Sequence, residues 1–202
     1  ESFGPNIIAR NEGYIIRGPC GLINLFYGSY VVYDNYGEDV STHTIDGNGL
    51  LFDHGCDNCL AYGNRFKRLT GNPGVNNSGV GIMVLDATNC RVYGNIVDGC
   101  KSGVYFGNKA PAQSSDIHNN TFLNCSLTGV DILSSANKST NFVRNNIFTS
   151  TNSAIAPTRV VAGAWTGESN NVFHGFGPAS GHTLDATDIT ADPLVDLNYR
   201  PQ

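Results

Sequence analysis

The chain has 202 residues, of which 14% are charged and 24 are glycine, and its formal net charge is −5. This length suits one domain, and low charge with abundant glycine suits stacked strands and turns better than helices. The negative charge argues against a nucleic-acid partner, whose phosphates require a basic surface. No apolar run approaches the roughly 18 residues of a membrane span, so no membrane partner is expected either.

One pattern occurs twice in the middle of the chain. A stretch ending at Asn95 leads to Gly103-Val104-Tyr105-Phe106, and a stretch ending at Asn120 leads to Gly129-Val130-Asp131-Ile132. The register extends in both directions at steps of 24 to 31 residues. The asparagines in this register are Asn11, Asn35, Asn64, Asn95, Asn120, Asn146 and Asn171. Such a recurrence marks a repeat protein and predicts seven turns of one unit.

Each unit has the pattern of short strands, because apolar and polar side chains alternate around the asparagine. The position three residues before it is apolar, which predicts an inward column of Ile8, Val32, Ala61, Val92, Ile117 and Val143. The next position predicts an outward column of Ala9, Tyr33, Tyr62, Tyr93, His118 and Arg144. Two residues after the asparagine, a second apolar column contains Phe66, Val97, Phe122, Phe148 and Phe173. Gly13 and Gly37 depart from that column.

A coil of about 25 residues has no room for a crossover helix, and like residues stack over like. The sequence therefore predicts an all-β fold, a single-stranded parallel β-helix of about seven rungs, which is a quasi-one-dimensional solenoid. A side-chain amide carries both a donor and an acceptor, so it can satisfy the backbone of a buried turn and also bond to the asparagines above and below. This predicts an internal asparagine ladder.

The repeated Asn-x-Phe or Asn-x-Val followed by Gly-Val-x-Ile resembles the right-handed parallel β-helix proteins. That superfamily contains pectate lyases, polygalacturonases, alginate lyases and epimerases, and phage tailspikes. The resemblance covers almost the whole chain and implies a right-handed coil, the usual hand of parallel crossovers. It also implies a secreted, extracellular protein whose partner is an acidic, uronate-containing polysaccharide. The repeat is specific for architecture rather than activity, because one coil carries many functions.

In chain order, residues 1–26 form the first predicted rung, and insertions at 38–48 and 70–78 enlarge the next two. Both insertions precede the same strand of the coil, which we call the face strand. The pattern weakens after Trp165, and residues 191–202 are predicted to cap a single domain spanning 1–202. Because the chain enters a rung almost at once, we expect an excerpt or processed part of a longer protein. Its open coil end would pair with preceding residues or with a second copy.

Four of the six cysteines follow the repeat. Cys59 and Cys90 lie five residues before ladder asparagines, and Cys100 and Cys125 lie five residues after them. Each pair should stack on adjacent rungs with Cα atoms about 5 Å apart, inside the disulfide range. Disulfides in an exported protein and buried free thiols both remain open. No second cysteine pair or histidine set supports a zinc site.

Loops on one side of a rigid coil usually build a binding wall, so the outward side of the face strand is the candidate site. The alternation predicts outward positions at Leu51, Asp53, Met83, Leu85, Tyr105, Gly107, Asp131, Leu133, Ala156 and Thr158. The predicted strand ends are His54, Asp86, Asn108, Ser134 and Arg159.

Uronate β-elimination requires a base and a cation or positive side chain that stabilises the developing charge. The candidate catalytic residues are Asp53, Asp86, Arg159, Lys101 and His54, and the candidate substrate-binding residues are Tyr105, Asp131 and Asn108. Asp46, Asp53 and Asp86 offer oxygen ligands that suit Ca²⁺. In a hydrolase, Asp53 and Asp86 would be the paired acids, about 5–8 Å apart.

Two functions stay open on this evidence. The first is a lyase-like or hydrolase-like polysaccharide-active protein, and the second is a non-catalytic structural or adhesive module whose coils stack end to end. Aspartates at rung ends also commonly cap turns, and no family catalytic motif is intact. The loop insertions and the mixture of acids, His54 and Arg159 favour the first reading.

Overall fold

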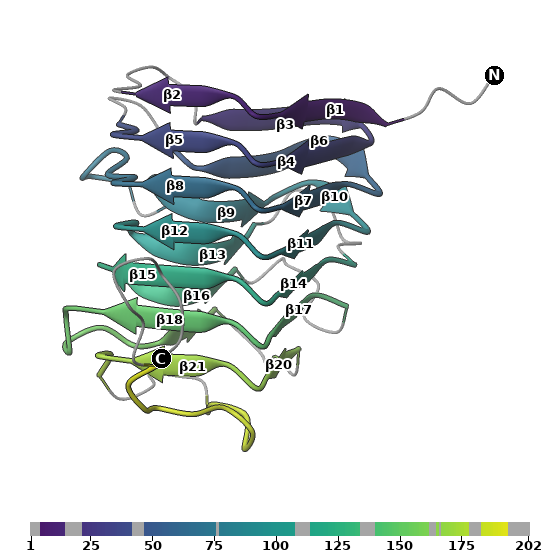
Figure 1. The fold of residues 1–202 in the computed structure, drawn as a ribbon. Helices are drawn as coiled ribbons and strands as arrows, with labels where there is room; N and C mark the ends of the chain where they lie inside the picture. The colour runs from purple at the N-terminus through teal and green to yellow at the C-terminus, as the bar shows by residue number, and fades with distance from the viewer. Residues whose placement is uncertain are drawn as a thin grey trace.

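Stacked coils form a parallel β-helix (Figure 1), and among the described residues six coils have a strand in each of three sheets and a seventh has strands in two. The computed structural model describes residues 5–14, 22–41, 47–75, 77–107, 114–133, 140–161, 165, 167–177 and 183–193. The regular structure of these residues consists of strands alone. Within the same residues, no helix is long and apolar enough to span a membrane. The all-β fold class predicted from the repeat is confirmed.

The strands form three parallel sheets of seven strands each. The first sheet contains β1 (Asn6–Ala9), β4 (Tyr30–Tyr33), β7 (Leu60–Tyr62), β11 (Arg91–Tyr93), β14 (Asp116–His118), β17 (Phe142–Arg144) and β20 (Glu168–Ser169). The second sheet contains β2 (Glu12–Tyr14), β5 (Tyr36–Glu38), β8 (Arg65–Lys67), β12 (Ile96–Asp98), β15 (Thr121–Cys125), β18 (Ile147–Ser150) and β21 (Val172–His174).

The third sheet is built from the face strands, and we call it the face sheet. It stacks β3 (Ile23–Gly28), β6 (Leu50–Asp57), β9 (Val80–Val84), β13 (Ser102–Phe106), β16 (Thr128–Ile132) and β19 (Thr158–Val160). Its seventh strand, β10 (Ala87–Thr88), pairs with the last residues of β6. The eight-residue β6 therefore extends past the neighbouring strands at this end of the sheet.

The ladder asparagines are buried at the bend between the first and second sheets, apart from Asn11 in the first coil. Asn35 shows the pattern: its Nδ2 and its backbone N–H both donate to Asn64 Oδ1, at 2.8 and 3.1 Å. The same Nδ2 donates to the carbonyls of Tyr33 and Ile8. Amide-to-amide bonds of this kind run without a break from Asn11 to Asn171, as the sequence predicts.

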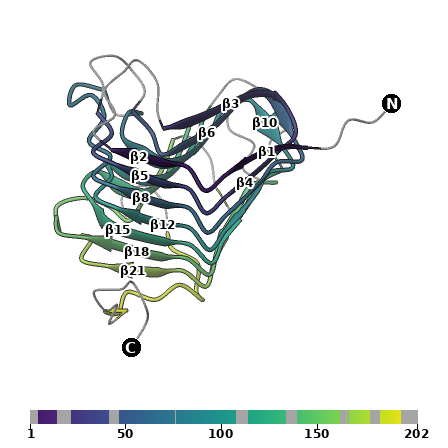
Figure 2. The ribbon, with the colours of Figure 1, turned by 45° about the horizontal axis from the view of Figure 1, so that its top comes forward.

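The residue before every ladder asparagine has a left-handed backbone. These residues are Arg10, Asp34, Gly63, Gly94, Asn119, Asn145 and Asn170, with φ between 53° and 66°. Glycine adopts this conformation freely, and asparagine and aspartate do so more readily than other residues. The sharp bend that results recurs from coil to coil (Figure 2). The ladder amide donates to two backbone carbonyls that lead into the bend, one on its own coil and one on the preceding coil, and so ties successive bends together.

The core contains the two predicted apolar columns. Members of the first column from Val32 to Val143 have no exposed surface, although Ile8 in the first coil is partly exposed. In the second column, the rings of Phe122, Phe148 and Phe173 stack at centroid distances of 4.8 and 5.0 Å. The gap at Gly37 is filled by Leu22, since a Cβ added to this glycine would lie 1.9 Å from Leu22 Cδ2.

The ladder ends in a carboxylate. The backbone N–H of Asn171 donates to Asp188 Oδ1 at 2.6 Å, and its Nδ2 donates to the same oxygen at 3.2 Å. A carboxylate accepts hydrogen bonds but has no N–H with which to continue the ladder. Residues 183–193 thus lie across the last coil, and Ile189 forms a bridge to Val172. The predicted cap at 191–202 lies mostly outside the described residues and stays a prediction.

Glu168 on β20 is buried beside this closing carboxylate. Burial, and then the negative charge of Asp188, raises the pKa of Glu168 to about 9. Burial also raises the pKa of Asp188. At neutral pH, Glu168 is therefore protonated in the folded chain, whereas its ordinary value of 4.5 means that it is ionised in the unfolded chain.

This difference makes stability depend on pH. The folded chain binds more protons than the unfolded chain between pH 4.5 and about 9, so the free energy of unfolding should fall as the pH rises through this window. Glu168→Gln stays neutral and should flatten that decline. Urea unfolding at pH 5, 7 and 8.5 measures the effect, and parallel curves for the variant and the parent protein would contradict it.

Candidate functional site

The face sheet bends at the end of its first two strands. Tyr27 and His54 have left-handed backbones, with φ of 52° and 49°, and each is followed by a glycine with positive φ. The pairing of β3 with β6 shifts register at this point, between Phe26 and Gly28. Such bulges redirect side chains and recur beside functional sites. Here the bulge interrupts the in-and-out alternation of side chains along the strand, and it places His54 at the margin of the sheet.

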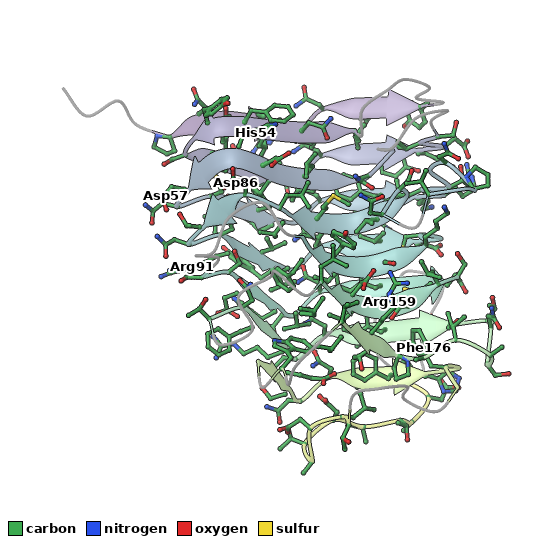
Figure 3. The ribbon with its side chains drawn as sticks, turned by 180° about the vertical axis from the view of Figure 1, so that it is seen from behind. His54, Asp57, Asp86, Arg91, Arg159 and Phe176 are labelled. Atoms are coloured by element: carbon green, nitrogen blue, oxygen red, sulfur yellow. The ribbon has the colours of Figure 1, made fainter. Side chains whose placement is uncertain are left out.

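Asp53, His54 and Asp86 meet at this bulge, and Figure 3 labels His54 and Asp86. One ligand atom from each residue lies within 4.8 Å of the other two. Asp53 Oδ2 lies 3.5 Å from His54 Nε2, and Asp53 Oδ1 accepts the backbone N–H of His54 at 2.8 Å. Asp53 is buried, whereas 43% of the His54 side chain is exposed. We call these three residues the acid–histidine cluster.

Two exposed aromatic residues border the cluster. The ring of Tyr27 stacks against His54 at a centroid distance of 5.8 Å, and the ring of Phe26 lies 5.4 Å from it. Tyr27 is 73% exposed and Phe26 is 39% exposed. The sequence reasoning missed this pair. The signal was the alignment of Phe26-Tyr27-Gly28 with Asp53-His54-Gly55, since a glycine after a bulky residue at the same register indicates a shared turn.

The outer side of the face sheet is more buried than the alternation predicts. Leu51, Met83 and Tyr105 stack in register and are at most 4% exposed. With Val80 they form an apolar cluster separate from the interior core. These positions face away from the interior as predicted, but they pack together as a second, smaller core and leave little exposed surface. The polar groups of the site lie at the two ends of this cluster.

At the far end, Arg159 forms an ion pair with Asp131. Arg159 Nε donates to Asp131 Oδ1 at 2.9 Å, and Nη2 donates to Oδ2. The Asp131 side chain is wholly buried, while 37% of the Arg159 side chain is exposed. Hydrogen bonding to Asp131 raises the pKa of Arg159. Burial, and then the charge of Asp131, raises the pKa of Tyr105 to about 12, so this phenol stays protonated.

The pairing of β16 with β19 corrects one register. Asp131 pairs with Arg159 and Val130 with Thr158, so Arg159 lies in the outer column and Thr158 points inward and is buried. The alternation in the sequence predicts an outward position for Thr158 and places Arg159 at the strand end. The error of one residue arises in the long segment between β18 and β19. This segment contains no ladder asparagine from which the register of β19 could be counted. Arg159, Tyr105, Leu133, Asn77 and Val161 line a hollow of about 430 Å³.

Lys101 does not join this surface. Its Nζ donates to the carbonyls of Val75, at 2.8 Å, and Asn72. Both acceptors belong to the inserted loop at 70–78, so Lys101 stabilises that loop. Burial lowers the pKa of Lys101. The expected role of Lys101 as a base or neutraliser is hard to reconcile with an ammonium that already bonds to two backbone carbonyls.

The expected residues thus fall into two groups. The acid–histidine cluster joins β6 to the residues after β9, and Arg159 lies on β19, four strands from β6. At about 4.8 Å per strand, the two groups are about 19 Å apart. Figure 3 shows Arg159 well below His54 and Asp86. Asp46, expected as a calcium ligand, and Asn108, expected to bind substrate, lie outside the described residues.

The five cysteines among the described residues are buried inside the coil as free thiols. Cys100 Sγ lies 3.6 Å from Cys125 Sγ. Cys59 interacts with Cys90 on the next coil and with Cys56 on its own. Contact with Cys100 and complete burial raise the pKa of Cys125 well above its ordinary value. Buried neutral thiols of this kind are poor nucleophiles, and they act here as small core residues.

One comparison with known proteins identifies a family. A family model described as "Periplasmic copper-binding protein (NosD)" matches residues 6–175. No curated protein and no solved structure matches the chain. The family match supports the β-helix superfamily that the repeat resembles, without assigning the chain to the pectate lyases in particular. The matched region runs from β1 to β21 and contains every described candidate residue of the site. Because it covers most of the sequence, the chain belongs to the NosD family.

Proposed function

We propose that this chain is an exported β-helix domain that binds acidic polysaccharide at the bulged corner of the face sheet, with a cation held by the acid–histidine cluster. The convergence of Asp53, His54 and Asp86 within 4.8 Å carries the proposal. Export agrees with the periplasmic description of the family.

The neighbours of the cluster suit a sugar polymer. Exposed rings such as those of Phe26 and Tyr27 provide apolar surfaces beside a few polar groups, the usual composition of a ligand site. A cation at Asp53 and Asp86 would accept the carboxylate of a uronate, since hard cations prefer oxygen ligands. At the far end of the sheet, Arg159 would contact a more distant carboxylate of the same polymer through its exposed edge.

The same geometry limits which residue could act as the base in a lyase-like reaction. Of the candidate bases His54, Lys101 and Arg159, only His54 belongs to the acid–histidine cluster, and its side chain is partly exposed. In that reaction His54 would take the proton next to the uronate carboxylate, and Asp53 and Asp86 alone would hold the cation, whose positive charge would stabilise the developing anion. Arg159 is about 19 Å away by strand spacing, so it would serve another subsite and not this step.

Copper binding by the cluster is the second candidate function, because the family model is described as copper-binding. The donor set fits: two carboxylates and one imidazole provide the oxygen and nitrogen ligands that Cu²⁺ accepts. Asp53, His54 and Asp86 would hold the ion. A copper ion there would supply a strong Lewis acid, and the residues themselves would orient it and exclude water on the buried Asp53 side.

Binding assays with pectate, alginate and glycosaminoglycans, with and without Ca²⁺, test the proposal. We expect Ca²⁺-dependent binding that Asp86→Asn weakens by about tenfold, the effect of losing one charged ligand contact. Asp34→Asn is the matched control, because it removes the same charge at an exposed bend where asparagine tolerates the left-handed backbone. Absorbance from new unsaturated ends separates a lyase from a binding domain.

Two outcomes would overturn the proposal. Equal loss of binding in Asp86→Asn and Asp34→Asn would show a general charge effect. Absence of binding to every glycan, together with concentration-dependent rods in electron micrographs, would favour the structural module whose coils stack end to end. Copper titration followed by electron paramagnetic resonance tests the second function, which predicts nitrogen coupling that His54→Ala removes.

A further inference from the structure

A second polar hollow lies around the corner from the acid–histidine cluster, where chain turns lead from the face sheet into the first sheet. It encloses about 760 Å³. Its walls come from β7, β11, β14 and β17 and from the four turns that precede them. They contain Asn58, Cys59, Leu60, Asn89, Arg91, Ser114, Asp116, Thr140, Phe142 and Arg144. We call it the turn groove. It shares no residue with the acid–histidine cluster.

The charges of the turn groove do not cancel. Arg144 Nε donates to Asp116 Oδ1 at 3.0 Å and its Nη2 donates to Oδ2 at 2.5 Å, so both carboxylate oxygens are engaged. Arg91 lies in register beside Asp116, yet the guanidinium of Arg91 has no ion-pair or hydrogen-bond partner among the described residues. The residues that line the groove include two arginines and one aspartate, an excess of one positive charge. Asp57 does not line the groove, and its carboxylate already accepts hydrogen bonds from Thr88, Asn58 and Asn89.

The other walls of the groove suit a sugar. The amides of Asn58 and Asn89 donate to Asp57, at 2.7 and 2.9 Å, which fixes both side chains and leaves their oxygens able to accept hydroxyl hydrogens. Phe142 is 43% exposed and offers an apolar ring face. A planar guanidinium binds carboxylate and sulfate oxygens through paired N–H groups.

We propose that the turn groove binds one anionic residue of an acidic saccharide, with its carboxylate or sulfate on Arg91 and its ring against Phe142. This inference takes only the class of ligand, an acidic saccharide, from the proposed function. Figure 3 shows Arg91 on the same side of the molecule as His54 and Asp86. A polymer that occupies the bulged corner could therefore continue into the turn groove.

Calorimetric titration with a galacturonate oligosaccharide in the presence of EDTA tests the groove by itself, because chelation removes any contribution from a cation at the acid–histidine cluster. We expect cation-independent binding that Arg91→Gln weakens by about tenfold or more, the value of a charge-assisted contact. Arg10→Gln is the matched control: Arg10 is also exposed and lies at the edge of the first sheet, away from the groove. It should leave the affinity within about twofold, as for a surface change without contacts.

Three results would overturn this inference. They are equal effects of Arg91→Gln and Arg10→Gln, equal affinity for a neutral galactose oligosaccharide, and binding of inorganic sulfate as tight as that of the oligosaccharide. Loss of all binding in EDTA, with Ca²⁺-dependent binding retained, would reject the turn groove and leave the proposed function standing. The reverse pattern would leave the groove standing and reject the cation site.

Discussion

Asn120→Ala is expected to lower the free energy of unfolding by about 3 kcal/mol or more, because it leaves several buried polar groups unpaired at once. Asn120 Nδ2 donates to the carbonyls of Val92 and His118 and to Asn146 Oδ1, all at 3.0 Å. Its Oδ1 accepts both the backbone N–H and the side-chain amide of Asn95. Urea unfolding measures the loss.

The matched control is Asn152→Ala. Asn152 is exposed and caps its own turn, accepting the backbone N–H of Ala154 at 3.0 Å, so its removal exposes groups that water can satisfy. We expect a loss of no more than about 1 kcal/mol there. Similar losses for Asn120→Ala and Asn152→Ala would show that the ladder decorates the bend without stabilising it.

Arg159→Ala should be nearly as damaging, at about 2–4 kcal/mol, because it leaves the carboxylate of Asp131 buried without a partner. Asp131 is wholly buried and bonds to Arg159 through both oxygens. Thermal or urea unfolding at pH 7 measures the loss.

The double variant Asp131→Leu with Arg159→Met separates the charge from the packing. Apolar side chains of similar size often replace a buried ion pair without loss, so the double variant should be more stable than Arg159→Ala alone. Because Met keeps an aliphatic stem, a double variant as unstable as Arg159→Ala would show that the unpaired buried charge of Asp131 is not the cause of the loss. In that case the ion pair between Asp131 and Arg159 would contribute little to the free energy of unfolding.

Most of the fold was predictable from the sequence because each coil repeats the same local chemistry. The left-handed residue, the ladder asparagine and the apolar residue after it recur together, as at Asn119, Asn120 and Phe122. The predicted register was wrong between Phe148 and Asn171, where these recurring residues are absent. As a result, Arg159 was predicted one position away from the outward position that it occupies. Asp188 was missed as the end of the ladder because a single aspartate after the last repeat resembles any turn residue.

The site was less predictable. The proximity of Asp53 and Asp86 followed from their places on neighbouring coils, but burial of the outer face did not. Alternation indicates which side a residue such as Met83 faces, and it does not indicate what packs against that side. The aromatic border of Tyr27 depends on a backbone bulge, which a period of two cannot describe. Lys101 is held away from Arg159 by its bonds to the loop at 70–78, and the sequence pattern does not indicate where this loop lies.

Anomalous diffraction from crystals soaked in Ca²⁺ or Cu²⁺ together with a galacturonate oligosaccharide tests the central functional proposal most directly. The account predicts a metal peak between Asp53, His54 and Asp86, with a sugar carboxylate completing the coordination and sugar rings beside Phe26 and Tyr27. A metal bound elsewhere, or an oligosaccharide bound while the three side chains hold no ion, would contradict it.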